Sequence, residues 1–447
     1  MDDFTVSAAA QARLERLVPA NLAFNAGHPG ETPGRQPVHT VYGGGHLFRS
    51  DTAARLGAIA RAALADYASD AQALSTALGL GAHAGAVYTR IGEKLAREAV
   101  EDFRIDFEDG YGNRPDAEED GHVVGAAHQV ATGLKAGTLP PFIGIRIKPL
   151  NEELRTRSLR TLSLFLKTLL GNGGRLPEHF VVTLPKITVP EQVAAFADVL
   201  ALLERDFGLP DGTLRFEVMI ETPQVVLGAD GTSPLPRLLA AAAGRLSAAH
   251  FGTYDYTAGL GITAAHQRMR HPACDFAKHM MQVAYAGTGI WLSDGATSVL
   301  PVALHRATPE SPLTARQLAE NRASVHHAWK LHYDDVRHSL VHAFYQGWDL
   351  HPAQLVTRYA AVFSFFLEGL DAAGARLRNF VTKAAQATLV GDVFDDAATG
   401  QGLLNYFLRG INSGAITEAE AVERTGLTVE EIRGRSFVRI LKARGGA

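Results

Sequence analysis

The stretch Arg-Phe-Glu-Val-Met-Ile-Glu-Thr-Pro, at residues 215–223, decides how the rest of the chain is interpreted. Strand-forming residues dominate its first six positions, and Thr222 followed by Pro223 ends the run abruptly. This pattern predicts a buried strand that stops at a loop. The last residue of the run is Glu221, and a carboxylate at the end of a strand is better placed to bind a ligand than to pack. We therefore expect Glu221 to be a functional residue.

Seven other segments have the same character, and several of them end in a polar or charged residue followed by proline or glycine. They are residues 38–48, 103–109, 142–148, 180–184, 248–252, 290–292 and 348–350. Helical patterns separate most of them, for example at residues 120–134, 152–170 and 191–207. Parallel strands joined by helices place all their carboxyl ends on one face. Eight such units predict an α/β fold of the (β/α)8 TIM-barrel type, with the active site on that face.

The alternative fold is a doubly wound open sheet. The Gly-x-Gly-x-x-Gly turn expected after its first strand is missing here, so we favour the barrel. We expect an N-terminal arm at residues 1–36, the barrel at residues 37–373, and a C-terminal helical extension or lid at residues 374–447. The arm contains a Gly/Pro-rich segment, and the extension contains short amphipathic helical patterns.

The composition limits the possible functions. The 447 residues are 46% hydrophobic and 20% charged, with a net charge of −4, which is typical of a globular protein with a large core. Basic residues are scattered rather than gathered in a stripe, so we expect no nucleic-acid partner. No apolar run reaches the roughly 18 residues needed to span a bilayer, and because the N-terminus is acidic we do not expect it to be a signal peptide. The single cysteine, Cys274, excludes an internal disulfide and favours the reducing cytoplasm.

Charged residues gather where the predicted strands end. They are Glu108, Asp109, Arg146, Lys186, Glu221 and Asp255. Glu221 and Asp255 follow adjacent strands, and carboxylates with water are the usual protein ligands of Mg²⁺. The planar fork of Arg146 suits a carboxylate or an enolate oxygen. Each residue alone has a structural explanation, since Glu221 could pair with a lysine and Asp255 could cap a loop. Their joint placement favours a metal site that stabilises an enolate.

Several of these segments resemble the motifs of one family. They are Ile105-Asp-Phe-Glu-Asp-Gly110, Gly144-Ile-Arg-Ile147, Leu184-Pro-Lys-Ile187, Ile220-Glu-Thr222, Phe251-Gly-Thr-Tyr-Asp255 and Gly347-Trp-Asp-Leu-His-Pro-Ala-Gln354. The segments follow one another in the same order as the motifs of that family. The chain thus resembles the HpcH/HpaI aldolase and citrate lyase beta-subunit-like family. That family includes malyl-CoA lyase and lies near the malate synthases and the pyruvate/phosphoenolpyruvate barrels.

The resemblance implies a role for each matching residue. Glu221 and Asp255 would bind Mg²⁺ or Mn²⁺, and Arg146, with Thr222 and Pro223, would bind the substrate. Glu108, Asp109 and Lys186 would complete the catalytic set. Gly391-Asp-Val-Phe-Asp395 resembles a loop whose aspartate is the acid/base and often reaches a neighbouring subunit. Asp395 is therefore our expected proton carrier, the alternative being a turn acid, and we expect a homo-oligomer, either a trimer or a hexamer.

The implied function is that of a Mg²⁺-dependent carbon–carbon lyase or aldolase acting on a small 2-oxoacid or hydroxyacid through an enolate. Two departures leave the use of a CoA thioester open. Residues 113–120 are acidic where the family is rich in Lys and Arg, and Trp348 stands where lysine is usual. A phosphotransfer enzyme of the phosphoenolpyruvate/pyruvate type and a non-catalytic metabolite-binding barrel are the alternatives.

Overall fold

The structure is a computed structural model that describes residues 7–30, 34–171, 174–382, 388–390, 393–395, 397–434 and 436–444. Its centre is a closed barrel of eight parallel strands, in which each strand pairs with the next and β8 pairs with β1. The strands are β1 (His39–Gly44), β2 (Asp102–Asp106), β3 (Phe142–Arg146), β4 (Phe180–Leu184), β5 (Arg215–Ile220), β6 (Leu246–Phe251), β7 (Trp291–Ala296) and β8 (Gln346–Asp349). The predicted (β/α)8 fold is confirmed.

Helices surround the barrel and extend beyond it. Those up to β7 are α1 (Ala8–Glu15), α2 (Val18–Gly27), α3 (Thr52–Tyr67), α4 (Ala71–Leu78), α5 (Ala84–Arg97), α6 (Asp116–Ala136), α7 (Arg155–Leu170), α8 (Pro190–Phe207), α9 (Pro223–Val226), α10 (Leu235–Ala241), α11 (Thr253–Gly259) and α12 (Pro272–Tyr285). The later ones are α13 (Ala315–Val341), α14 (Gln354–Thr382), α15 (Ala397–Ser413), α16 (Glu418–Thr425), α17 (Val429–Arg433) and α18 (Phe437–Arg444). No helix among the described residues is both long and apolar enough to cross a membrane.

Strand β2 ends earlier than the sequence pattern predicts, at residue 106 instead of 109. The reason is the side chain of Asp106, which accepts the backbone N–H of Glu108 at 2.9 Å and that of Gly110 at 2.7 Å. An aspartate that bonds the backbone beyond itself turns the chain out of an extended conformation. This turn places Glu108 and Asp109 at the rim of the barrel.

The inside of the barrel holds a buried ionic layer. Arg104 donates to both oxygens of Glu217, at 2.7 and 2.8 Å, and also pairs with Asp102. His250 lies 2.9 Å from Glu217, and all four residues are at most 3% exposed. Barrel interiors are more often filled by branched apolar side chains. Here the buried charges are paired, as burial requires. They form a layer below the carboxyl mouth, which is the end of the barrel where the carboxyl ends of all eight strands lie.

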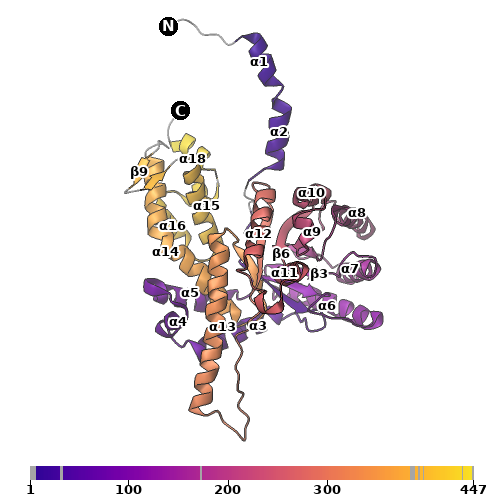
Figure 1. Cartoon of the computed structure of the whole chain (residues 1–447), viewed down its shortest axis with the longest axis vertical. Coiled ribbons are helices and arrows are strands. Elements are labelled where there is room, and N and C mark those ends of the chain that lie inside the picture. The colour runs from indigo at the N-terminus through magenta and orange to yellow at the C-terminus, as the bar shows by residue number, and fades with distance from the viewer. Residues whose placement is uncertain are drawn as a thin grey trace.

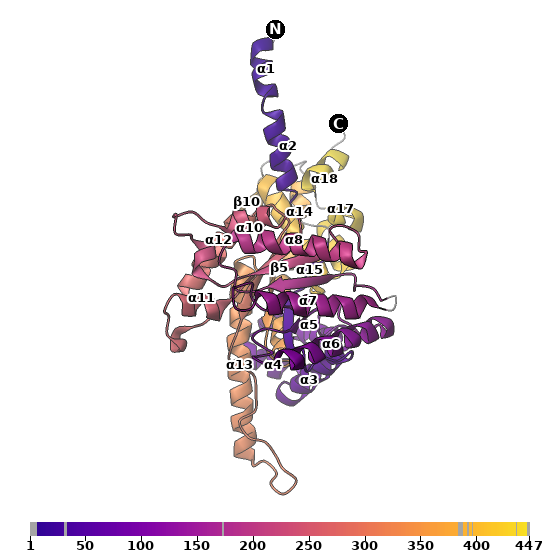
Figure 2. The ribbon, with the colours of Figure 1, turned by 90° about the vertical axis from the view of Figure 1, so that its right-hand side faces the viewer.

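Two parts project from the barrel at opposite ends of the long axis (Figures 1 and 2). Helices α1 and α2 leave the amino side and contain no buried residue. Helix α13, with the segment that leads into it, extends beyond the opposite end. Helix α14 follows β8 and continues without a break past residue 373 to Thr382, and α15 and α16 pack against it. Within the segment predicted to be a helical extension, Thr388–Val390 form a strand, β9, which pairs with β10 (Val393–Asp395).

Candidate active site

Arg146 ends β3 and is held at the centre of the carboxyl mouth. Its Nε and Nη2 donate to the two oxygens of Asp106 at 2.7 and 2.5 Å, and Nη1 lies 3.2 Å from Glu108. Its guanidinium carbon lies 4.8 Å from the ring centre of Tyr42 and 5.3 Å from that of Trp348. Burial alone would lower the pKa of Arg146, but Asp106 and Glu108 raise it, so the guanidinium stays charged. A fixed, permanently charged fork is suited to binding a carboxylate.

Lys186 joins the acids of neighbouring strands. Its ammonium binds Glu108, donates to Asp109 at 2.8 Å and lies 3.5 Å from Asp255. The residue has a φ of 48°, in the left-handed region that non-glycine residues rarely adopt. This conformation aims its backbone N–H at Glu221 Oε1, 2.7 Å away. Strained backbone of this kind is common at functional sites.

Glu221 lies directly beyond β5 and is 2% exposed. Oε1 accepts the hydrogen bond from Lys186, and no hydrogen-bond donor of the described residues reaches Oε2. Gly252 makes room for this side chain, since a β-carbon there would lie 2.5 Å from Glu221 Oε2. Burial raises the pKa of Glu221 to about 8, and Asp255 and Glu108 add to the increase while Lys186 opposes it. The site therefore disfavours the negative charge of Glu221 until a cation balances it.

These residues fit a divalent cation. Among the described residues, five carboxylates (Asp106, Glu108, Asp109, Glu221 and Asp255) surround two cations, Arg146 and Lys186. No three described His, Cys, Asp or Glu residues are grouped as a metal cage. A site of two carboxylates, completed by water and substrate oxygens, is the kind that Mg²⁺ uses in many enzymes. Glu221 Oε2 and the exposed Asp255 would hold the ion.

The structure thus brings six predicted residues together, namely Glu108, Asp109, Arg146, Lys186, Glu221 and Asp255. Thr222 and Pro223, predicted to bind substrate, have structural contacts. The Thr222 hydroxyl donates to the carbonyl of Ile187 at 2.5 Å, and Pro223 begins α9. The backbone of Asp395 lies in β10, but its side chain is outside the described part of the chain.

Sequence reasoning missed three residues of the site, namely Asp106, Tyr42 and Trp348. Asp106 lies in the motif Ile105-Asp-Phe-Glu-Asp-Gly110, and its position two residues before Glu108 could have revealed it. Tyr42 gave no signal, because it is an ordinary strand residue until the barrel closes and β1 approaches β8.

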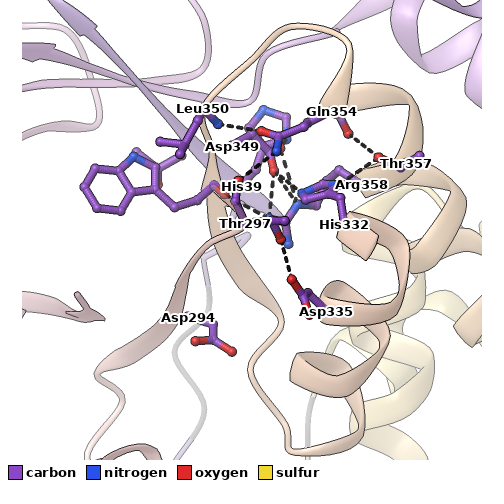
Figure 3. A network of polar contacts seen from close by, with 12 residues as sticks. His39, Asp294, Thr297, His332, Asp335, Asp349, Leu350, Gln354, Thr357 and Arg358 are labelled. Carbon is purple, nitrogen blue, oxygen red and sulfur yellow. Dashed lines mark hydrogen bonds and ion pairs between the residues drawn. The ribbon is translucent and has the colours of Figure 1, made fainter. Parts of the chain in front are cut away.

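A buried polar network fixes the end of β8 (Figure 3). Asp349 accepts hydrogen bonds from Arg358 at 2.8 Å and from His332 at 3.0 Å, and His39 lies 3.5 Å away. Gln354 accepts the N–H of Leu350 at 2.8 Å and donates to the carbonyl of Thr297 at 3.0 Å. The network joins β1, β8, α13 and α14, and so it locks the position of the strand that carries Trp348.

A family model described as "Domain of unknown function (DUF6986)" matches residues 17–440. The chain belongs to the DUF6986 family. Its match to a curated relative, the L-malyl-CoA/beta-methylmalyl-CoA lyase of Haloarcula marismortui, is 42% identical over 78 residues. That match covers 17% of this chain and spans only about a fifth of the relative, 21% of its length.

Solved structures align with this DUF6986 member over most of its length. A citrate lyase from Burkholderia xenovorans LB400 aligns over 88% of this chain and 98% of its own, with a TM-score of 0.56 and 17% identity. A CitE protein from Mycobacterium tuberculosis aligns over 89% of this chain and all of its own (100%), with a TM-score of 0.45 and 13% identity. The predicted resemblance to the citrate lyase beta-subunit-like proteins is confirmed, and the citrate lyase shows it at the level of the fold.

Proposed function

We propose that this protein is a Mg²⁺-dependent carbon–carbon lyase or aldolase that acts on a small 2-oxoacid or hydroxyacid through an enolate. The observation that carries the proposal is the position of Glu221. Its buried carboxylate has one oxygen without a donor among the described residues, and it shares the carboxyl mouth with Asp255 and the fixed guanidinium of Arg146. The two relatives named as a malyl-CoA lyase and a citrate lyase are consistent with this class.

Each residue has a defined part in the proposed reaction. Arg146 binds the carboxylate of the oxoacid and stabilises the negative charge that develops when the carbon–carbon bond breaks. Asp106 keeps its guanidinium in one orientation. When Mg²⁺ is bound by Glu221 and Asp255, it supplies Lewis acidity at this site. Lys186 neutralises Glu108 and Asp109, and Asp395 carries the proton.

A binding and turnover screen tests the proposal. Glyoxylate, pyruvate, oxaloacetate and their aldol or CoA adducts are offered with Mg²⁺, and turnover of at least one adduct is expected. Calorimetry should show that Glu221→Gln binds Mg²⁺ at least tenfold more weakly than the wild type. The reason is that the substitution removes one of the two carboxylates proposed to bind the ion. Equal Mg²⁺ affinity in the two proteins would remove Glu221 from the metal site.

The same screen decides between the alternatives. Phosphoryl transfer from phosphoenolpyruvate, without any carbon–carbon cleavage, would identify a phosphotransfer enzyme. Binding of an oxoacid without turnover of any adduct would identify a metabolite-binding barrel. Turnover of CoA adducts alone would extend the substrate class to thioesters.

A further inference from the structure

Tyr42 and Trp348 form an aromatic floor beside Arg146. Their ring centres are 4.2 Å apart, and both rings lie within cation–π distance of its guanidinium. Tyr42 comes from β1 and Trp348 from β8, the two strands that close the barrel. Trp348 is paired with Thr40 on one side and with Ala296 on the other, so its position is set by the backbone register of three strands.

The aromatic floor keeps accessible surface beside Arg146. Tyr42 and Trp348 are both partly exposed, whereas Arg146 beside them is 2% exposed. On the amino side, the ionic layer of Arg104 and Glu217 lies close to Tyr42 and is itself at most 3% exposed. Any molecule whose carboxylate reaches Arg146 therefore meets the aromatic floor with its neighbouring carbon atoms.

The free surface of the aromatic floor is hydrocarbon. The indole nitrogen of Trp348 is buried and has no hydrogen-bond partner among the described residues, so the exposed part of this ring consists of carbon. The Tyr42 hydroxyl is directed across the barrel to the sulfur of Met219, 3.9 Å away. A charged group placed on such a surface would lose hydration without gaining a partner.

We propose that the aromatic floor determines substrate specificity by binding an apolar substituent on the carbon chain of the oxoacid. The inference rests on the proposed function, because it uses Arg146 as the carboxylate anchor. The favoured substrate class is then a 2-oxoacid, or its aldol adduct, with an alkyl or aryl group beside the oxo carbon. An oxoacid with a second carboxylate at that position is disfavoured.

Calorimetric titration of an oxoacid series in the presence of Mg²⁺ tests the inference. The series is glyoxylate, pyruvate, 2-oxobutanoate and 2-oxopentanoate, with oxaloacetate as the charged member. The wild-type dissociation constant should fall about fourfold for each added methylene group that is buried. In Trp348→Ala and in Trp348→Gln, the ratio of the 2-oxopentanoate and glyoxylate affinities should fall to near one. Trp348→Gln removes the aromatic surface but leaves a smaller gap than alanine, and it serves if the alanine variant does not fold.

Trp291→Ala is the matched control. Trp291 begins β7 at the amino end of the barrel, away from the mouth, so this variant should keep the wild-type dependence on chain length. The inference is overturned if the Trp348 variants keep that dependence, if Trp348→Ala binds the longer acids more tightly, or if the wild type prefers oxaloacetate to 2-oxobutanoate. If the wild type binds no oxoacid at all, the proposed function fails, and the inference fails with it.

Discussion

Asp106 is the residue on which the geometry of Arg146 depends. It binds the guanidinium through both carboxylate oxygens and at the same time turns the chain toward Glu108. Both groups are buried, so the pair cannot exchange its partners for water. Glu108 and Lys186 hold the other side of the mouth, which leaves Asp106 to set the direction in which Arg146 faces a substrate.

Asp106→Asn should therefore weaken oxoacid binding at least tenfold and lower the free energy of unfolding by about 1–3 kcal/mol, because a charge-assisted pair is replaced by a weaker bond. Calorimetry and denaturant unfolding measure the two effects. The matched control is Glu204→Gln, since Glu204 also forms a buried two-bond pair with an arginine, Arg245, at 2.7 and 2.8 Å, outside the site. An equal loss of oxoacid affinity in both variants would show that Asp106 acts only through stability.

At the scale of elements, β5 and β6 approach each other so closely that only glycine fits beside Glu221. A β-carbon at position 252 would lie 2.5 Å from both Cβ and Oε2 of Glu221. Gly252→Ala should displace this carboxylate, and a shift of that size typically reduces turnover about 100-fold. Mg²⁺ calorimetry and turnover check the effect.

The control is Gly125→Ala on α6, because nothing lies within 4 Å of a β-carbon there. This variant should keep the wild-type turnover and Mg²⁺ affinity, and its free energy of unfolding should be unchanged or higher by about 0.5–1 kcal/mol. Normal Mg²⁺ affinity in Gly252→Ala would contradict the proposed metal site.

The contact between β1 and β8 predicts a dependence of stability on pH. Burial lowers the pKa of His39 from 6.5 to about 4, although Asp349 and Glu101 oppose the shift and Arg358 and Lys94 add to it. His39 Nε2 accepts the N–H of Glu101 at 3.0 Å, so the ring is neutral in the folded barrel. His39 binds a proton near pH 6.5 in the unfolded chain but only near pH 4 in the folded chain. Its contribution to the free energy of unfolding is therefore fully present above pH 6.5 and is lost as the pH falls toward 4.

Between pH 6.5 and pH 4, the protonation of His39 should lower the free energy of unfolding by on the order of 3 kcal/mol. Denaturant unfolding at several pH values measures it, with His39→Gln as the comparison, because glutamine can accept the same N–H without titrating. A wild type whose stability changes with pH no more than that of His39→Gln would show that His39 is not the linked group.

At the scale of the whole molecule, the proposed proton carrier Asp395 belongs to the extension rather than to the barrel. If it serves a neighbouring subunit, the protein must be an oligomer, which we expect to be a trimer or a hexamer. Light scattering should then find no active monomer. Mixing Asp395→Asn with Glu221→Gln should restore part of the activity that each variant lacks alone, because a mixed assembly contains mouths with both groups intact. No recovery in stably mixed assemblies would place Asp395 in its own subunit or outside the reaction.

The sequence by itself determined the barrel and most of its charged mouth. Runs of strand-forming residues that end in Glu221, Asp255 or Lys186 are local patterns, and parallel pairing brings their ends together in any closed barrel. Helix α13 was not predicted, because its 27 residues are largely polar, although Thr314 and Gln317 form a capping box at its start. Strand β7 was predicted too short, because Ser293, Asp294 and Gly295 have low strand propensity. Pairing of Ser293 with β6 and β8, and of Ala296 with β8, extends the strand across this segment.

Only the tertiary structure decided what surrounds Arg146. Asp106, Tyr42 and Trp348 come from β2, β1 and β8, and no local pattern relates residues 42, 106, 146 and 348. The closure of the barrel sets these contacts through the register of paired strands. The burial that raises the pKa of Glu221 likewise exists only after folding. Glu221, within the stretch at residues 215–223, could thus be recognised from the sequence, but the aromatic floor and the orientation of the arginine required the fold.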